Sequence, residues 1–308
     1  MPKVKSYLSL IKFSHTIFAM PFALIGFFLG LLKPNYKDYA TSIVPGWHTE
    51  IFSPATQWNL NRTISWGGDY SFSKDSLMGK LFEGSLNPKL LCAQYAALVI
   101  LCMVFARSAA MAFNRYLDRK YDAKNPRTAV REIPSGILKE NNVLLFTIVN
   151  CLLFIVTCFF INRLCFYLSP VALAVVLGYS YTKRFTPLCH LILGLGLSLA
   201  PIGAYLAVTG QFALLPILFS LVVIFWVSGF DIIYALQDEE FDKSQKLYSV
   251  PAWLGKAKAL RVSELLHLLS ASAVVFAGLY GGFGWLYWAG VAIFTGMLVY
   301  QHSIIKPT

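Results

Sequence analysis

The chain has 308 residues, of which 57% are hydrophobic and only 13% are charged. Together with a mean hydropathy of +0.60, this composition excludes a soluble globular domain and indicates a membrane protein with several spanning segments. The net charge of +11 is typical of basic loops on one side of a bilayer, facing anionic lipid, and does not indicate nucleic-acid binding.

Apolar runs recur along the chain at the length that one bilayer crossing requires, about 20 residues. They predict eight transmembrane helices, near residues 13–32, 90–113, 143–161, 164–182, 187–209, 212–234, 259–281 and 284–304. The predicted fold is an all-α polytopic transmembrane helix bundle, with residues 1–308 as a single domain. A signal peptide is the alternative for the first run, but that run is long and has no small-residue cleavage site.

The segment over residues 33–89 separates the first two predicted helices. It is polar, and it contains Trp47, Trp58 and Trp66. It is too long for a simple connection between helices. We expect an external loop insertion with some order of its own, which lies on the membrane surface through its aromatic side chains.

A first group of acidic residues follows the second predicted helix. Asn114, Asp118 and Asp122 are spaced by four residues. In a helix, steps of four and eight residues rotate by about 40 and 80 degrees, so the three side chains lie on one face. Arg127 and Arg131 follow directly, and cations at this position suit a site for a multiply charged anion.

A second group begins at the end of the sixth predicted helix with Asp231, Asp238 and Asp242. In a regular helix, residues seven and eleven positions after Asp231 point within about 20 degrees of its direction. The three side chains therefore lie on one stripe of the helix, with Tyr234 beside it. Stacked carboxylates repel one another unless a cation neutralises them, and oxygen ligands suit Mg²⁺ that is shared with a substrate phosphate. The two groups predict a diphosphate site; the alternative is a pair of solvated loop faces flanked by lysines.

Basic residues predict the orientation of the bundle. With a cytoplasmic N-terminus, most of the 26 Lys and Arg fall on the cytoplasmic side, mainly within 107–139, 183–184 and 243–261. Both acidic groups then lie at the cytoplasmic ends of helices. A cation-coupled transporter is the alternative from another functional class, but it would place its carboxylates near the bilayer midplane in broken helices.

Two motifs resemble the signatures of the UbiA superfamily of intramembrane aromatic prenyltransferases. The first is NRYLDRKYD over residues 114–122, followed by RT at 127–128 and REIPSG at 131–136; the second is DIIYALQDEEFD over 231–242. YSYTKRFT, over 179–186, resembles the tract that these enzymes carry between the two. The tyrosine in the second motif is typical of the 4-hydroxybenzoate polyprenyltransferase branch, including relatives assigned to menaquinone routes. Members typically have nine helices, so the resemblance also implies a further helix after residue 308. It further implies a central cavity that opens near the cytoplasmic side.

The resemblance implies an activity, a cofactor and a set of site residues. The activity is Mg²⁺-dependent transfer of a polyprenyl group from its diphosphate to the ring of 4-hydroxybenzoate, ortho to the hydroxyl, in ubiquinone-type quinone biosynthesis. Prenylation of a related aromatic acid in menaquinone biosynthesis is the alternative. The implied location is a bacterial inner membrane, in contact with lipid, and no pattern specifies an oligomeric state.

Residue roles follow from the same resemblance. Mg²⁺ is assigned to Asp118, Asp122, Asp238 and Asp242, with Asn114 as a supporting ligand, and Asp231 either binds a second metal ion or orients the acceptor. Candidate partners of the diphosphate or of the acceptor carboxylate are Lys12, Arg127, Arg131, Lys183 and Arg184, with Arg127 and Arg131 preferred. For each of these cations, anchoring at the cytoplasmic membrane surface is the alternative. The ring faces of Tyr179, Tyr181 and Tyr234 are candidates for stabilising an allylic carbocation; packing in the bundle is the alternative, and the functional role is favoured only for Tyr234.

Overall fold

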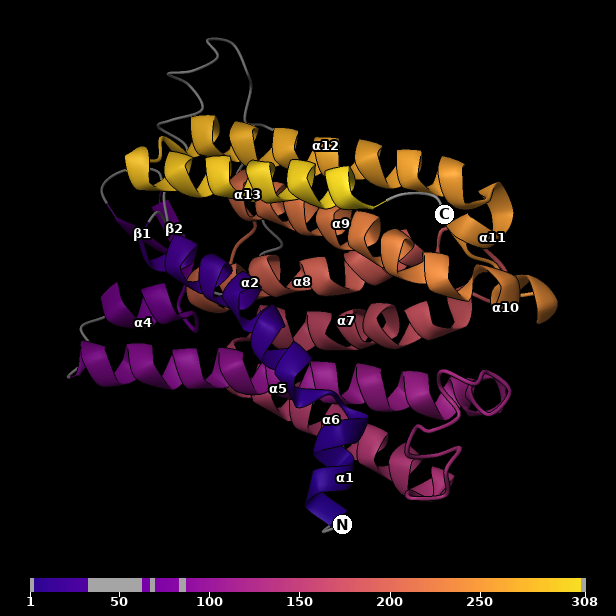
Figure 1. Ribbon diagram of the computed structural model, residues 1–308. Coiled ribbons are helices and arrows are strands. Elements are labelled where there is room, and N and C mark those ends of the chain that lie inside the picture. The colour runs from indigo at the N-terminus through magenta and orange to yellow at the C-terminus, as the bar shows by residue number, and fades with distance from the viewer. Residues whose placement is uncertain (1–2, 33–62, 67–69, 83–86, 306–308) are drawn as a thin grey trace.

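The structure is a computed structural model that describes residues 3–32, 63–66, 70–82 and 87–305 (Figure 1). Its helices are α1 (Lys3–Leu10), α2 (Phe13–Leu32), α4 (Leu77–Phe82), α5 (Pro88–Asp122), α6 (Glu140–Ile161), α7 (Arg163–Thr182), α8 (Cys189–Thr209), α9 (Leu214–Ala235), the 3-10 turn η3 (Leu236–Asp238), α10 (Glu239–Ser244), α11 (Val250–Leu254), α12 (Lys256–Gly281) and α13 (Trp285–Ile304). Strands β1 (Thr63–Trp66) and β2 (Tyr70–Ser73) form an antiparallel hairpin.

All eight apolar runs are helical, which confirms the predicted all-α bundle. Within the described ranges, six helices are long and apolar enough to cross a membrane: α5, α6, α7, α8, α12, and α9 with its continuation to Ser244. Helix α2 adds a shorter apolar stretch over Ala19–Leu32. The chain is therefore an integral membrane protein, and the number of crossings stays a prediction.

Close contact between α2 and α8 depends on two glycines. Gly26 and Gly30 lie four residues apart on α2, so they share one face. A Cβ on Gly26 would overlap the carbonyl oxygen of Pro201, and a Cβ on Gly30 would lie 2.7 Å from the Cβ of Val208. Small residues at this spacing let two membrane helices approach closely, because backbone can pack against backbone. Helix α2 is thereby fixed against α8 in the middle of the bundle.

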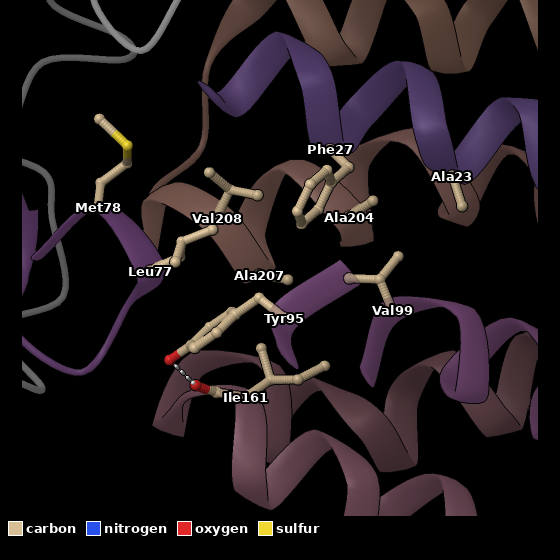
Figure 2. Packing of buried hydrophobic residues seen from close by; sticks show 10 residues of the cluster. All are labelled: Ala23, Phe27, Leu77, Met78, Tyr95, Val99, Ile161, Ala204, Ala207 and Val208. Atoms are coloured by element: carbon tan, nitrogen blue, oxygen red, sulfur yellow. Dashed lines mark hydrogen bonds between the residues drawn. The ribbon is translucent and has the colours of Figure 1, made fainter. Parts of the chain in front are cut away.

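A cluster of buried residues closes the end of the bundle where α5 begins (Figure 2). Leu77 of α4 is fully buried and packs with Phe27, Val208 and Tyr95. The Tyr95 hydroxyl accepts a hydrogen bond from Lys80 Nζ at 2.8 Å and lies 2.9 Å from the carbonyl oxygens of Asp75 and Ile161. The described part of the 33–89 insertion therefore packs against the helix bundle through α4.

The rest of the insertion, including Trp47 and Trp58, lies outside the described residues, and its placement on the membrane surface stays a prediction. Helix α5 runs without a break from this end to Asp122, roughly 40 Å from Tyr95 at 1.5 Å per residue. The hairpin and α4 thus lie at one end of the bundle, and α10 and α11 lie at the other (Figure 1).

Helix α9 corrects one sequence prediction. The second acidic motif does not continue as one regular helix, because α9 ends at Ala235 and is followed by the 3-10 turn η3 and then by α10. Asp231 lies on α9, Asp238 ends the turn and Asp242 lies on α10. Three residues of 3-10 geometry turn the chain by about 60 degrees more than an α-helix would, so the three side chains spread over about 80 degrees instead of about 20 and still share one side of the segment.

Candidate active site

Both acidic motifs line one cavity of about 450 Å³ at the end of the bundle opposite to α4. Its walls are the C-terminal ends of α5, α7 and α9, the loop over 123–131, the start of α8, and η3 with α10. Of the fourteen predicted site residues, thirteen line this cavity: Lys12, Asn114, Asp118, Asp122, Arg127, Arg131, Tyr179, Lys183, Arg184, Asp231, Tyr234, Asp238 and Asp242.

Tyr181 does not line this cavity, so its predicted direct contact with substrate is not supported. Its side chain is 45% exposed, and its ring centroid lies 5.9 Å from that of Phe113. The Arg184 guanidinium lies 5.6 Å from the Tyr181 ring. Tyr181 therefore supports Arg184 from outside the cavity, through a cation–π contact.

The first motif presents its polar side chains from α5. Asn114 Nδ2 donates to Asp118 Oδ2 at 3.1 Å, and Arg184 Nη2 lies 3.4 Å from Asp118 Oδ1. Arg131 Nη1 donates to both oxygens of Asp122, at 2.7 and 2.8 Å. The helical spacing read from the sequence holds here because α5 is unbroken through Asp122. Each carboxylate of this motif is paired with a guanidinium from another segment.

Arg127 joins the first motif to the second. Its Nη2 donates to Asp238 Oδ2, and its Nε donates to Asp238 Oδ1 at 3.1 Å. Arg127 Nη1 also donates to the Tyr234 hydroxyl at 3.1 Å. Burial acts to lower the pKa of Arg127, but the bonds to Asp238 outweigh it and leave the pKa raised. A two-bond Arg–carboxylate pair of this kind fixes orientation as well as charge.

Asp242 is fully buried beside Lys183. Its Oδ1 forms an ion pair with Lys183 Nζ at 2.7 Å. Its Oδ2 has no hydrogen-bond partner among the described residues, so this oxygen keeps free acceptor capacity. Burial acts to lower the pKa of Lys183, but the Asp242 carboxylate outweighs it, so the pKa is raised. A buried carboxylate with free acceptor capacity suits a further cation.

Asp231 is paired with a histidine that the sequence analysis did not select. His190, the second residue of α8, has Nδ1 2.7 Å from Asp231 Oδ2. The backbone N–H of Val250 points at His190 Nε2, at 3.3 Å. A lone ionisable residue at the edge of a membrane helix was the available signal, because such residues seldom lie there without a function.

Arg107 and Arg115 are two further cations that the sequence analysis treated only as orientation signals. Both line the cavity, and within the described residues Arg107 Nε and Arg115 Nη1 are buried without a hydrogen-bond partner. Lys12 reaches the cavity from the link between α1 and α2, where its φ is 44°. Burial lowers the pKa of Lys12, and the positive charges of Arg115 and Arg131 lower it further. Tyr234 acts in the opposite direction but does not outweigh them.

The charges in the cavity favour an anionic ligand. Among the described residues, seven Lys and Arg side chains line it against five Asp side chains, an excess of two positive charges before His190 is considered. Arginines with unpaired N–H groups in a partly dry cavity bind phosphate or carboxylate well, because both oxyanions match the guanidinium geometry. The cavity therefore has the charge and the donors that a diphosphate needs.

The carboxylates fit a metal ion that is shared with a ligand better than one held by protein alone. In the described part of the chain, no group of three His, Cys, Asp or Glu side chains is close enough to chelate a metal ion. Mg²⁺ commonly binds through one or two carboxylates and completes its shell with water and substrate phosphates. Asp242, with its free acceptor capacity, and Asp118 beside Asn114 supply oxygen ligands of that kind.

An apolar cavity of about 180 Å³ adjoins the polar one. It lies between α5, α6, α7 and α8, with α2 on one side. Both cavities are lined by Arg107, Met111, Tyr179, Leu193 and Leu197. On α7 the apolar lining extends from Tyr179 to Cys165, roughly 21 Å at 1.5 Å per residue. A charged head group and a long apolar tail can therefore bind side by side.

Known proteins resemble this chain in sequence and fold. A family model described as the UbiA prenyltransferase family matches residues 79–308. The 4-hydroxybenzoate octaprenyltransferase of Aliivibrio salmonicida is 32% identical over 212 residues, covering 67% of this chain and 72% of that protein. The Alcanivorax borkumensis protein of the same name is 31% identical over 205 residues, covering 66% and 70%.

Two solved structures share the fold. The apo structure of a UbiA homolog from Aeropyrum pernix K1 has a TM-score of 0.71 and 25% identity, covering 94% of this chain and 88% of that one. A UbiA homolog from Archaeoglobus fulgidus bound to GPP and Mg²⁺ has a TM-score of 0.65 and 18% identity, covering 97% and 87%.

Proposed function

Because the chain belongs to the UbiA prenyltransferase family, we propose that it transfers a polyprenyl group from a polyprenyl diphosphate to the ring of 4-hydroxybenzoate, ortho to the hydroxyl, in a ubiquinone-type pathway. The observation that carries this proposal is the junction of two cavities, one rich in Asp, Lys and Arg and the other apolar. Relatives named 4-hydroxybenzoate octaprenyltransferase support the choice of acceptor. The family match does not favour the transporter alternative.

The donor diphosphate binds in the polar cavity. Asp118, Asp122, Asp238 and Asp242, with Asn114 in support, would hold Mg²⁺, which when bound neutralises charge on the diphosphate oxygens as a Lewis acid. Arg127, Arg131, Lys183 and Arg184 donate to the same oxygens, because each already lies beside one of these carboxylates. The Archaeoglobus fulgidus homolog was solved with GPP and Mg²⁺ bound, which supports a prenyl diphosphate and Mg²⁺ as the ligands.

The reaction breaks the bond between the allylic carbon and the diphosphate oxygen. Cations around the diphosphate stabilise the negative charge that builds on the leaving group. The ring carbon ortho to the hydroxyl then forms the new carbon–carbon bond with the allylic cation, and that carbon gives up its proton to the released diphosphate, which restores aromaticity. Tyr179 and Tyr234 line the cavity and present ring faces to a cation. A membrane-embedded cavity also keeps water away from the carbocation.

The acceptor binds at the junction of the two cavities. Arg107 lines both of them and has a buried Nε without a partner in the described residues, so it is suited to bind the acceptor carboxylate. Asp231 lies on α9, seven residues before Asp238 at the end of η3, and so deeper in the bundle. We assign Asp231 to the acceptor hydroxyl and place the cavity on the cytoplasmic side, where positive-inside bias puts the basic loops.

An assay on membranes that contain the protein tests the proposal. Radiolabelled 4-hydroxybenzoate and geranyl diphosphate are incubated with Mg²⁺ or with a chelator, and the prenylated acid is extracted and measured. The wild-type protein should form product only with the divalent cation. The double variant Asp118→Ala, Asp238→Ala should form none, because each change removes one carboxylate from the two motifs.

Glu140→Ala combined with Glu240→Ala is the matched control. Both glutamates are exposed acidic residues, and neither lines the cavity. This variant should keep wild-type activity. Product from the aspartate double variant at the wild-type rate would contradict the proposed site, and product with a different aromatic acid alone would move the reaction to another pathway.

A further inference from the structure

The Asp231–His190 pair lies where α8, α9 and α11 meet. His190 is 4% exposed, whereas the Asp231 side chain is 31% exposed and lines the polar cavity. One carboxylate oxygen, Oδ2, lies 2.7 Å from His190 Nδ1. Asp231 therefore has one oxygen fixed by a buried partner, while the exposed part of its carboxylate faces the cavity.

The surroundings of His190 determine which ring nitrogen carries hydrogen. The backbone N–H of Val250 can only donate, so Nε2, 3.3 Å away, must provide the lone pair. In the neutral ring the hydrogen is then on Nδ1 and is donated to Asp231 Oδ2. Nδ1 therefore donates to Asp231 Oδ2, and this bond fixes the orientation of the carboxylate toward the cavity.

Close packing of α8 on α9 places the two residues opposite each other. Ser228 Oγ donates to the carbonyl oxygen of His190 at 3.0 Å, and a Cβ on Gly194 would lie 2.6 Å from the carbonyl oxygen of Ile224. Gly194 lies one helical turn after His190, and Ser228 lies one turn before Asp231. A larger residue at Gly194 would therefore separate the pair.

We propose that His190 is a positioning residue, which holds the Asp231 carboxylate as the hydrogen-bond acceptor for the hydroxyl of the aromatic substrate. This inference rests on the proposed function and names how its acceptor is recognised. The hydroxyl donates to the carboxylate oxygen that His190 leaves free, and the ring carbon ortho to it is thereby held toward the allylic carbon. Aromatic acids without that hydroxyl gain nothing from Asp231.

Two substitutions at His190 separate its two hydrogen bonds. The side-chain amide of asparagine puts an N–H donor near the position of Nδ1, so His190→Asn keeps the bond to Asp231. Glutamine reaches the position of Nε2, so His190→Gln keeps an acceptor for the Val250 N–H and loses the bond to Asp231. His190→Ala loses both bonds.

The discriminating measurement is the ratio of dissociation constants for benzoate and 4-hydroxybenzoate, which differ only in the hydroxyl, determined with purified full-length protein. Steady-state KM values for acceptor and donor are measured in parallel. His190→Asn should keep the wild-type ratio. His190→Gln and His190→Ala should lower it by about 10- to 100-fold, the effect of losing a hydrogen bond to a charged group, with the donor KM unchanged.

Three outcomes would overturn the inference while leaving the proposed function standing. One is an unchanged ratio in all three variants of an active protein. Another is an equal loss of affinity for both acids, which a purely structural role of His190 predicts. The third is a lower ratio in His190→Asn and His190→Ala but not in His190→Gln, which would assign the effect to the Val250 bond. A wild-type protein that does not turn over 4-hydroxybenzoate would instead refute the proposed function itself.

Discussion

Replacing Gly194 by alanine tests the close contact between α8 and α9 on which the site depends. The added Cβ would lie 2.6 Å from the Ile224 carbonyl oxygen and closer still to Ser228 Oγ. The first of these atoms is backbone and cannot rotate away, so one helix must move from the other. Gly196→Ala is the matched control, because its Cβ would meet nothing closer than Val176 Cγ1 at 3.8 Å.

The expected magnitude follows from two opposing effects. Alanine is favoured over glycine inside a helix by about 1 kcal/mol, and this gain applies equally to both positions. Overpacking in a well-packed interior costs about 1 to 3 kcal/mol, and this cost applies only at Gly194. The difference in free energy of unfolding between the two variants isolates the clash, so Gly194→Ala should be less stable than Gly196→Ala by about 1 to 3 kcal/mol.

Chemical denaturation of the purified variants in mixed micelles measures this difference, with helical circular dichroism as the signal. Gly194→Ala should also reduce turnover more than Gly196→Ala does, because the clash lies one turn from His190 on α8. Equal stability and equal turnover of the two variants would refute the argument that α8 and α9 touch at Gly194.

Four further variants test separate parts of the site. Burial lowers the pKa of Lys12 below its ordinary 10.5, so the charged side chain destabilises the folded protein at any pH below the folded pKa. This destabilisation disappears as the pH rises from the folded pKa to 10.5. Lys12→Met should therefore raise the thermal midpoint of the substrate-free protein at neutral pH. In the wild type the donor KM should rise between the folded pKa of Lys12 and pH 10.5, because Lys12 loses its charge there. Lys12→Met should have a higher donor KM that does not change over this pH range. Asp242→Asn should raise the Mg²⁺ concentration for half-maximal activity about tenfold and leave the acceptor KM unchanged. Arg107→Met should raise the KM for 4-hydroxybenzoate without affecting turnover of a neutral phenol. Tyr95→Phe, in the network with Lys80, should lower the free energy of unfolding by about 1 to 3 kcal/mol and leave kcat unchanged.

The sequence predicts those features that depend on local periodicity. Apolar runs of sufficient length become helices in a bilayer because backbone groups have no other partners there. The face shared by Asn114, Asp118 and Asp122 follows for the same reason, since α5 continues unbroken through all three residues. Helix α9 shows the limit of this reasoning, because the 3-10 turn at Leu236–Asp238 changes the pitch inside the second motif.

Pairings between distant segments are not encoded in local spacing. Arg127 and Asp238 are 111 positions apart, and His190 and Asp231 are 41 positions apart, so no periodicity connects them. Arg107 interrupts an otherwise apolar part of α5, which is the signal that distinguishes it from a loop cation. The cavity itself cannot be predicted from the sequence. The faces of α5, α7 and α8 that enclose it are set by helix packing at positions such as Gly194.

The pairing of every cavity aspartate explains why basic residues are interleaved with the acidic motifs. Asp118, Asp122, Asp238 and Asp242 each lie beside an Arg or Lys, and Asp231 lies beside His190. Without these partners, five carboxylates around one cavity would repel each other and disfavour folding. Under the proposed function, the same cations turn to the diphosphate as the carboxylates turn to the divalent ion, so each charge exchanges one partner for another. A diphosphate that enters together with its divalent ion changes the net charge of the cavity little. The diphosphate alone, or the ion alone, would leave buried charged groups unpaired.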